Sequence, residues 1–337
     1  MQLFRAFLLR LATTAVTLIG VAVIVFVVIR VVPGNPIAMM LPPGATEADI
    51  ARLTAQYGLD KSIPAQFLIW CQGVVQGDFG TSITSNQPVL RLVLGRLPAT
   101  LELSIMALVI AVVIGGAIAL TGTRNRGTKV EAALDVGNGM ALSVPDFLWG
   151  LVLILIFGVL WPVFHISGRV TPSLELPFTT DFYLFESVLR LRFDLWADIV
   201  SHMFMPALAL AIPLAAIIGQ LLKQSLKETM HLDYVTLART KGYGENHVIT
   251  REALPNAILP TLTLVGVQFT FLIGGTVIIE RLFSYEGLGN MAIDAVINRD
   301  LPLIQGIVIL FAAIFTAVNL IVDLSYALLN PRLRHGQ

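Results

Sequence analysis

The segment from Gly122 to Lys129 comes closer than any other in this chain to a phosphate-binding sequence. It reads Gly-Thr-Arg-Asn-Arg-Gly-Thr-Lys. A phosphate-binding loop needs lysine directly after its second glycine, followed by serine or threonine, because the lysine and the backbone amides together surround the phosphates. Here threonine follows the second glycine and lysine comes one place later. We therefore interpret the segment as a short basic loop and not as a nucleotide site.

The side chains that could hold a metal or attack a substrate are dispersed along the chain. No HExxH sequence is present, and the histidines are scattered at positions 165, 202, 231, 247 and 335. Zinc sites that can be read from sequence have closely spaced ligands, so the pattern predicts neither a zinc site nor an intramembrane metalloprotease. Ser104 and Ser143 are typical of hydrogen bonds between helices rather than of nucleophiles. A single cysteine, Cys71, excludes an internal disulfide framework.

The composition of the chain explains why residues suited to catalysis are so scarce in it. The 337 residues are 56% hydrophobic and 13% charged, with a mean hydropathy of +0.81, whereas soluble domains carry about 25% charged residues. The net charge is zero, which gives no support for binding nucleic acid. These values indicate an integral membrane protein. The missing catalytic motifs predict that it is not itself an enzyme, so any ATP it depends on would be hydrolysed by another chain.

Apolar stretches define the elements that must position the polar residues. A bilayer core of about 30 Å requires about 20 apolar residues in a helix. We predict an all-α protein with six transmembrane helices, at Leu11–Ile29, Leu103–Thr121, roughly Met140–Leu160, Met203–Leu222, Ala257–Ile279 and roughly Leu301–Val322.

Basic residues orient these spans with both termini in the cytoplasm. In that arrangement twelve lysines and arginines stand against six acids on the inner side, and ten stand against thirteen on the outer side, as the positive-inside rule requires. The chain then divides into residues 1–32 (tail and first span), 33–101 (an outer segment), 102–330 (five further spans) and 331–337 (an inner tail).

Helices are also predicted outside the spans. In the first outer segment, Thr46 starts one helix, with Ile50, Leu53 and Tyr57 at helical spacing, and Ile63–Val75 forms a second, with Trp70 suited to the membrane surface. In the second outer segment, Phe182–Val200 is expected to lie on the membrane.

The inner connection at residues 223–256 is the longest polar segment on its side. Tyr234, Leu237, Ala238 and Lys241 are predicted to share one helical face, and Gly242 to end that helix in a left-handed conformation. A second helical run, Val248–Ala253, is predicted to be broken by Leu254-Pro255. Short helices of mixed charge at the inner face favour a docking surface, with a solvated loop as the alternative.

These residues resemble the EAA loop of ABC importer permeases, in which a glycine precedes the proline of a Leu-Pro pair by thirteen positions. Gly242 and Leu254-Pro255 have that spacing, and Asp233–Gly242, read as DYVTLARTKG, resembles the DYVRTARAKG form of the peptide/nickel group. Further resemblances to the first (DppB/OppB-type) permease of the pair lie at Pro33–Pro36, Tyr57–Asp60, Gly77–Ser82, Arg96–Leu103, Phe283–Gly289, Arg299–Pro302, Val322–Tyr326 and Asn330–Arg332. Departures occur at Asn35, Thr236-Leu237 and Tyr285-Glu286, and at Gln220 and Lys223, which stand near positions often occupied by arginine.

The resemblance implies a multi-pass inner-membrane protein of the type I (MetI-like) permease fold. It implies a heterodimer with a second homologous permease, two ATP-binding subunits that bind ATP and Mg²⁺, and a periplasmic or extracellular solute-binding protein. The implied cargo is a peptide, and nickel chelates, opines, glutathione and heme are alternatives. The residues implied to couple the chain to an ATPase subunit are Asp233, Tyr234, Thr236, Ala238, Arg239, Lys241, Gly242, Leu254 and Pro255.

Polar groups within the spans raise separate expectations. Asp146, next to Pro145, would cost about 2.5–3.5 kcal/mol in a bilayer, so Asp146 and nearby Trp149 are candidates for the translocation pathway, with a structural hydrogen bond or a position near the interface as the alternative for Asp146. Glu102 is expected to be solvated and Asp323 structural. The pairs Gly115-Gly116 and Gly274-Gly275 predict tight helix packing. An intramembrane hydrolase and a passive channel remain competing function classes.

Overall fold

The computed structural model describes residues 2–31, Thr46 and residues 60–329, with side chains at 12–28, 46 and 60–322. The helix predicted to start at Thr46 and the side chain of Asp323 therefore lie outside the described part. Two compact units are present: Met1–Leu97 with Asn290–Thr316, and Pro98–Gly289 with Ala317–Gln337. Among the described residues the regular structure is helical, apart from one isolated bridge between Thr81 and Pro88.

The first unit contains α1 (Gln2–Val31) and α4 (Ile63–Val75). The bounds of α4 confirm the predicted second helix of the outer segment. The Trp70 ring lies 5.7 Å from Phe26 and 6.1 Å from Phe67, measured between ring centroids. Trp70 therefore packs against α1 within this unit.

Two sequence motifs that are far apart in the chain meet in the same unit. The buried carboxylate of Asp300 accepts hydrogen bonds from the Ser82 hydroxyl at 2.5 Å and from the Thr84 amide at 3.1 Å. Gly80, at φ +83°, lies against Pro302. The segments Gly77–Ser82 and Arg299–Pro302 therefore pack against each other.

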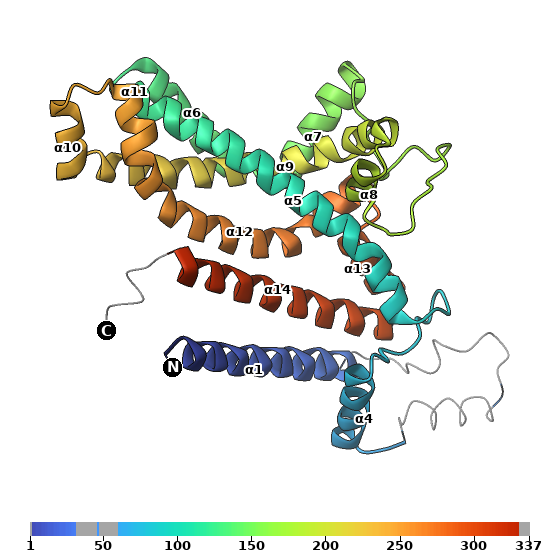
Figure 1. The fold of residues 1–337 in the computed structure, drawn as a ribbon. Coiled ribbons are helices and arrows are strands. Elements are labelled where there is room, and N and C mark those ends of the chain that lie inside the picture. The colour runs from blue at the N-terminus through green and yellow to red at the C-terminus, as the bar shows by residue number, and fades with distance from the viewer. Residues whose placement is uncertain (1, 32–45, 47–59, 330–337) are drawn as a thin grey trace. The chain divides into compact units, whose positions relative to one another are not determined.

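The second unit is built around the long helix α9 (Phe193–Thr229), whose apolar face is buried along most of its length. Packed against it are α6 (Lys129–Ser143), α7 (Asp146–Leu153), α8 (Tyr183–Leu189) and α12 (Leu254–Leu282). In Figure 1, α12 runs alongside α9. Three helices, α5 (Val89–Arg124), α13 (Leu288–Ile297) and α14 (Leu301–Leu329), contribute residues to both units.

Glycine allows α5 and α9 to approach closely. A Cβ atom at Gly115 would lie 2.6 Å from the Ala215 carbonyl oxygen and 3.1 Å from the Gly219 amide nitrogen. The packing prediction is confirmed for Gly115. Cβ atoms at Gly116, Gly274 and Gly275 would meet no atom of the described chain within 4 Å.

The predicted set of six spans is not reproduced among the described residues. Four helices there are long and apolar enough to cross a membrane, at Val89–Arg124, Phe193–Thr229, Glu245–Leu282 and Leu301–Val322. A bent pair, Lys129–Ser143 with Asp146–Leu160, would make a fifth. The first predicted span coincides with α1. Its apolar part with described side chains, Ala12–Val28, is shorter than the four helices given above.

The stretch predicted as the third span, roughly Met140 to Leu160, is not one straight helix. The helix ends at Ser143 and resumes at Asp146, with a bend of 103°. Val144, at φ −101° and ψ +124°, is extended, because a following proline disfavours helical geometry in the residue before it. Beyond α7 the chain continues as a π-helical turn, η1 (Ile154–Leu160).

Phe182–Val200, expected to lie on the membrane or dip into it, contains a break between two helices. It is divided between α8 and the first turns of α9, with Leu191 at φ +54° between them. The predicted basic loop is confirmed as a short turn, because α5 ends at Arg124 and α6 begins at Lys129.

Candidate functional site

The candidate coupling segment (residues 223–256) contains α10 (Asp233–Thr240), which ends at a glycine turn. Gly242 has φ +84°, as predicted. The Tyr243 amide donates to the Ala238 carbonyl at 3.4 Å and the Gly242 amide donates to the Arg239 carbonyl at 2.9 Å. These two bonds form a Schellman cap, which satisfies carbonyls at the helix end and requires a left-handed residue at the position of Gly242.

One face of α10 is buried. Val235 and Ala238, three residues apart, have exposed fractions of 0% and 5%. They belong to a cluster formed by the ends of α5 and α9, the π-helical turn η2 (Val248–Ala253) and the start of α12, whose other members are Ala119, Leu222, Leu226, Met230, Val248, Ile249, Ala253 and Ala257. This cluster packs the segment as one body onto two long helices.

Hydrogen bonds and an ion pair also hold the coupling segment together. Arg239 donates from Nε and Nη2 to the Glu245 carboxylate at 3.2 and 2.8 Å, and from Nη1 to the Met230 carbonyl at 3.2 Å. The Tyr234 hydroxyl accepts a hydrogen bond from the Asn256 amide at 2.8 Å. Arg239 therefore joins the two sides of the glycine turn, and Tyr234 joins α10 to α12.

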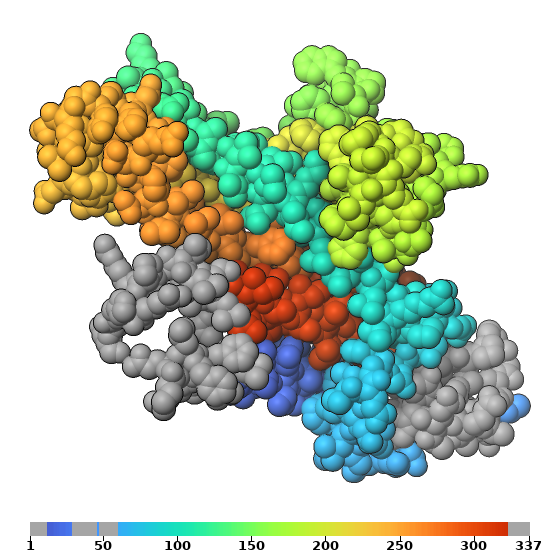
Figure 2. Space-filling view, in the orientation of Figure 1, coloured from blue at the N-terminus to red at the C-terminus, as the bar shows by residue number. Residues whose placement is uncertain are grey.

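The opposite face of α10 is open. Tyr234 and Leu237 are 38% and 55% exposed, and Asp233, Thr236 and Lys241 lie beside them. Ala238 was predicted to share a face with Tyr234. It lies instead on the buried face with Val235. In Figure 2 the segment forms a protruding orange lobe.

Leu254-Pro255 does not break the helix, contrary to the prediction. Residues Glu245–Leu282 form one continuous span, in which the π-helical turn passes into α12 at Leu254. Pro255 lies in the first turn of α12, where its missing amide and fixed φ are tolerated. Leu254 is partly buried and Pro255 is exposed.

The two candidate pathway residues lie together at the bend between α6 and α7. Asp146 is the first residue of α7, and its carboxylate accepts a hydrogen bond from the Phe147 amide at 2.8 Å. The Trp149 indole donates to the Ala141 carbonyl on α6 at 3.4 Å. Both side chains are half-buried.

Glu102, expected to be solvated, is buried in an ion pair. Its carboxylate lies 2.8 Å from Nη2 of Arg169, and both side chains are 6% exposed. The Arg169 guanidinium lies 3.8 Å from the centroid of the Tyr183 ring and donates to the Asp181 carbonyl. Sequence reasoning missed this Arg169 network (Glu102, Arg169, Tyr183) because Arg169 comes from the 161–182 loop, 67 residues away.

Two other buried acidic groups shape the same unit. Hydrogen bonds from Thr180 and Thr179, together with Arg190, lower the pKa of the Glu186 carboxyl from its usual 4.5 to about 2, with burial opposing them. Fully buried Glu280 accepts a hydrogen bond from the Thr100 hydroxyl at 2.7 Å.

The glycine pattern after α12 follows from the position of Glu280. A Cβ atom at Gly287 would collide with the Glu280 carboxylate, and one at Gly289 would lie 3.0 Å from its Oε2 atom and 2.6 Å from the Val277 Cα atom. Burial raises the pKa of the neighbouring Tyr285 hydroxyl, so Tyr285 stays neutral.

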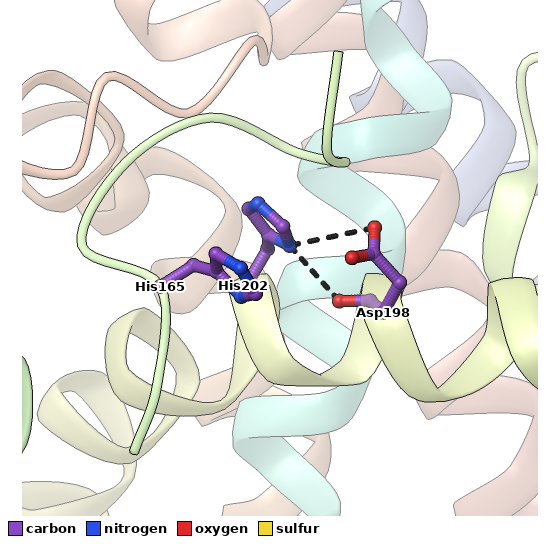
Figure 3. Close-up of side chains that lie close together, drawn as sticks. All are labelled: His165, Asp198 and His202. Carbon is purple, nitrogen blue, oxygen red and sulfur yellow. Dashed lines mark hydrogen bonds and ion pairs between the residues drawn. The ribbon is translucent and has the colours of Figure 1, made fainter. Parts of the chain in front are cut away.

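The structure brings together two of the histidines that looked scattered. His165, in the 161–182 loop, stacks on His202 of α9 with ring centroids 4.0 Å apart, and Asp198 lies one helical turn before His202 (Figure 3). The two histidines are 37 positions apart in the sequence, so their spacing gives no local signal of the contact.

Comparison with known proteins agrees with these features. Residues 107–335 match the model of the binding-protein-dependent transport system inner membrane component, and residues 3–104 match the model of the N-terminal part of such membrane components. A chain of the inward-facing MetNI methionine ABC transporter has the same fold, with a TM-score of 0.53 at 12% identity over 69% of this chain and 93% of that chain.

Curated relatives match over nearly the whole length. The dipeptide transport system permease protein DppB of Escherichia coli K12 is 36% identical over 97% of both chains. The di/tripeptide permease protein DppB of Pseudomonas aeruginosa is 33% identical over 97% of both, and the oligopeptide permease protein AppB of Bacillus subtilis is 31% identical over 94% of this chain and 95% of its own. The chain belongs to the family of binding-protein-dependent transport system inner membrane components.

Proposed function

We propose that this chain is a transmembrane permease subunit of an ATP-driven importer for peptides. It forms half of the translocation pathway with a second, homologous permease. Two separate subunits hydrolyse ATP, and a solute-binding protein delivers the cargo. Full-length relatives named as dipeptide, di/tripeptide and oligopeptide permeases support the cargo class.

The observation that carries the coupling role is the two-faced build of α10. Its inner face is packed onto α9 and α12, while Tyr234 and Leu237 remain exposed. Exposed apolar side chains on a rigid polar segment are typical of a docking surface. A force applied there by an ATPase subunit would reach both long helices, because the segment is packed onto them as one body. Such a displacement of packed helices is an established form of switching between two states.

Gly242→Asp tests this role. A Cβ atom at this position would meet nothing within 4 Å, but the residue would have to keep φ +84°, a left-handed conformation that costs most residues about 1–2 kcal/mol and aspartate less, and the variant adds a charged side chain to the docking face. We expect the variant to assemble with its partners while peptide uptake falls at least tenfold relative to ATP hydrolysis, measured in proteoliposomes. Transport at the normal rate would refute the coupling role.

Gly244→Ala is the matched control. Gly244 lies two positions away at φ −64°, and a Cβ atom there also meets nothing within 4 Å. We expect this variant to keep normal coupling. If both variants uncouple transport equally, the effect does not come from the left-handed turn.

A pathway role for Asp146 and Trp149 is part of the proposal. The helix break between α6 and α7 supports it, because interrupted helices at membrane depth are tolerated where they line a cavity or are buried in protein. Asp146→Asn removes the charge and keeps the shape. We expect uptake of cationic peptides to fall more than uptake of neutral ones, measured by competition in proteoliposomes, and equal losses would exclude the pathway role.

The cargo class is tested separately from coupling. The intact complex is purified with its soluble binding protein, and the bound solute is identified by mass spectrometry. Peptides are expected, whereas a metal chelate, an opine, glutathione or heme would overturn the cargo assignment and leave the coupling mechanism standing.

A further inference from the structure

Hydrogen bonds set the tautomers of both stacked histidines. His202 Nδ1 lies 2.9 Å from the Asp198 carbonyl oxygen, which can only accept, so Nδ1 carries the proton. The Ser201 hydroxyl donates to that carbonyl at 2.7 Å and therefore accepts from His165 Nδ1 at 2.8 Å. The His202 nitrogen nearest the Asp198 carboxylate is this same Nδ1, 3.7 Å from Oδ2, so it binds a metal only after its proton moves to Nε2 and its lone pair is free.

Asp198 completes a set of three ligand-bearing residues. Its carboxylate accepts from the Thr171 hydroxyl at 2.6 Å and from the Thr171 amide at 2.9 Å, one bond to each oxygen. Each carboxylate oxygen retains a free lone pair. These bonds fix the carboxylate in the way that outer-shell partners orient metal ligands.

The three side chains lie near one another, but the two imidazole planes are parallel to within 4°, so the rings must turn before both lone pairs point at one ion. One candidate ligand atom from each of His165, Asp198 and His202 lies within 4.8 Å of the other two. Ligands bound to zinc at about 2.0–2.2 Å lie about 3.4 Å from one another, so the three groups must close in by up to about 1.4 Å. His202 is 4% exposed and His165 is exposed, which places the entry route on the side of His165.

We propose that His165, Asp198 and His202 form a binding site for a divalent transition-metal ion of the zinc type, which clamps the 161–182 loop onto α9. Two imidazoles and one carboxylate favour zinc, copper or nickel over magnesium or calcium, which take oxygen ligands. The loop also carries Arg169, so the ion would hold in place the element that covers Glu102. This site is independent of the coupling role and of the cargo.

The test is a titration of the full-length chain, purified with its native partner subunits through a tag without histidine, stripped with a chelator and placed in nanodiscs. Zn²⁺ is added in a calorimeter, and X-ray absorption at the zinc edge counts imidazole ligands. The variants are His165→Gln, which removes an exposed ligand, and Thr171→Val, which removes one bond to Asp198. His231→Gln is the matched control, because His231, in the turn after α9, bonds the Lys227 carbonyl with its ring and is not one of the three proposed ligands.

We expect one Zn²⁺ per permease with two imidazole ligands in the wild type and in His231→Gln. In His165→Gln the dissociation constant should rise more than tenfold, and in Thr171→Val about tenfold, the usual effect of losing an outer-shell partner. Wild-type binding that is unchanged by His165→Gln, or that His231→Gln weakens equally, would overturn the proposal. So would the absence of zinc binding by the wild type.

Discussion

At the scale of single residues, the buried pair of Glu102 and Arg169 has the largest structural consequence. A charge taken out of water is tolerated only when it is paired and hydrogen-bonded. Here the carboxylate also accepts from the Phe185 amide at 3.2 Å, and the guanidinium faces the Tyr183 ring. The pair thereby fixes the 161–182 loop and α8 to the start of the membrane-spanning part of α5.

Arg169→Met should destabilise the chain strongly, because it leaves Glu102 buried without its counter-charge. We expect a loss of about 3–5 kcal/mol in the free energy of unfolding, measured by denaturant titration in detergent micelles. The double variant Glu102→Gln, Arg169→Met should recover a large part of it. Arg192→Met, which removes the exposed partner of Asp194, is the control, and a loss as large in this variant would contradict the account.

At the scale of elements, the contact between α5 and α9 depends on backbone approach. Gly115 on α5 faces Ala215 and Gly219 on α9, while its neighbour Gly116 faces no described atom within 4 Å. Two adjacent glycines of one helix thus have different surroundings, and the sequence alone does not distinguish them.

Gly115→Ala is therefore expected to separate the two helices. Its Cβ atom would press on the Ala215 carbonyl, which belongs to the backbone and cannot rotate away, and overpacking of this kind costs about 1–3 kcal/mol. Gly116→Ala should be neutral or slightly stabilising, since alanine favours a helix over glycine by up to about 1 kcal/mol. Thermal unfolding of the two variants in the same detergent gives the comparison, and equal midpoints would exclude the contact.

At the scale of the whole molecule, the chain is mostly helical and belongs to a family of transport components that work with other proteins. Its candidate coupling segment presents apolar side chains on the outside, where a lone membrane protein would gain nothing from exposing them. The sequence nearest to a phosphate loop has the wrong order of residues and forms the turn between α5 and α6.

The isolated chain is therefore expected to leave peptide gradients unchanged. Liposomes that contain only this polypeptide, with ATP inside and the solute-binding protein outside, should accumulate no labelled peptide above the external concentration. Addition of the second permease and the ATP-hydrolysing subunits should establish accumulation. Concentrative uptake by the chain alone would contradict both the proposed division of labour and the role of the segment.

The sequence by itself determined what depends on neighbours along the chain. The bounds of α4, the left-handed Gly242 and the α10 helix followed from local spacing, since a glycine cap and an apolar repeat act within a few residues. Leu254-Pro255 shows the limit of this reasoning, because the effect of proline depends on its place in a helix and that place was misjudged.

Only the tertiary structure decided which distant residues meet. Glu102 looked like a solvated carboxylate until Arg169 was found beside it, and the histidines looked scattered until His165 was found stacked on His202. The structure likewise shows how sharp the bend before Asp146 is, at 103°. Such contacts depend on the way in which the long helices and their loops pack together. The sequence of one segment does not contain information about which distant residue it will contact.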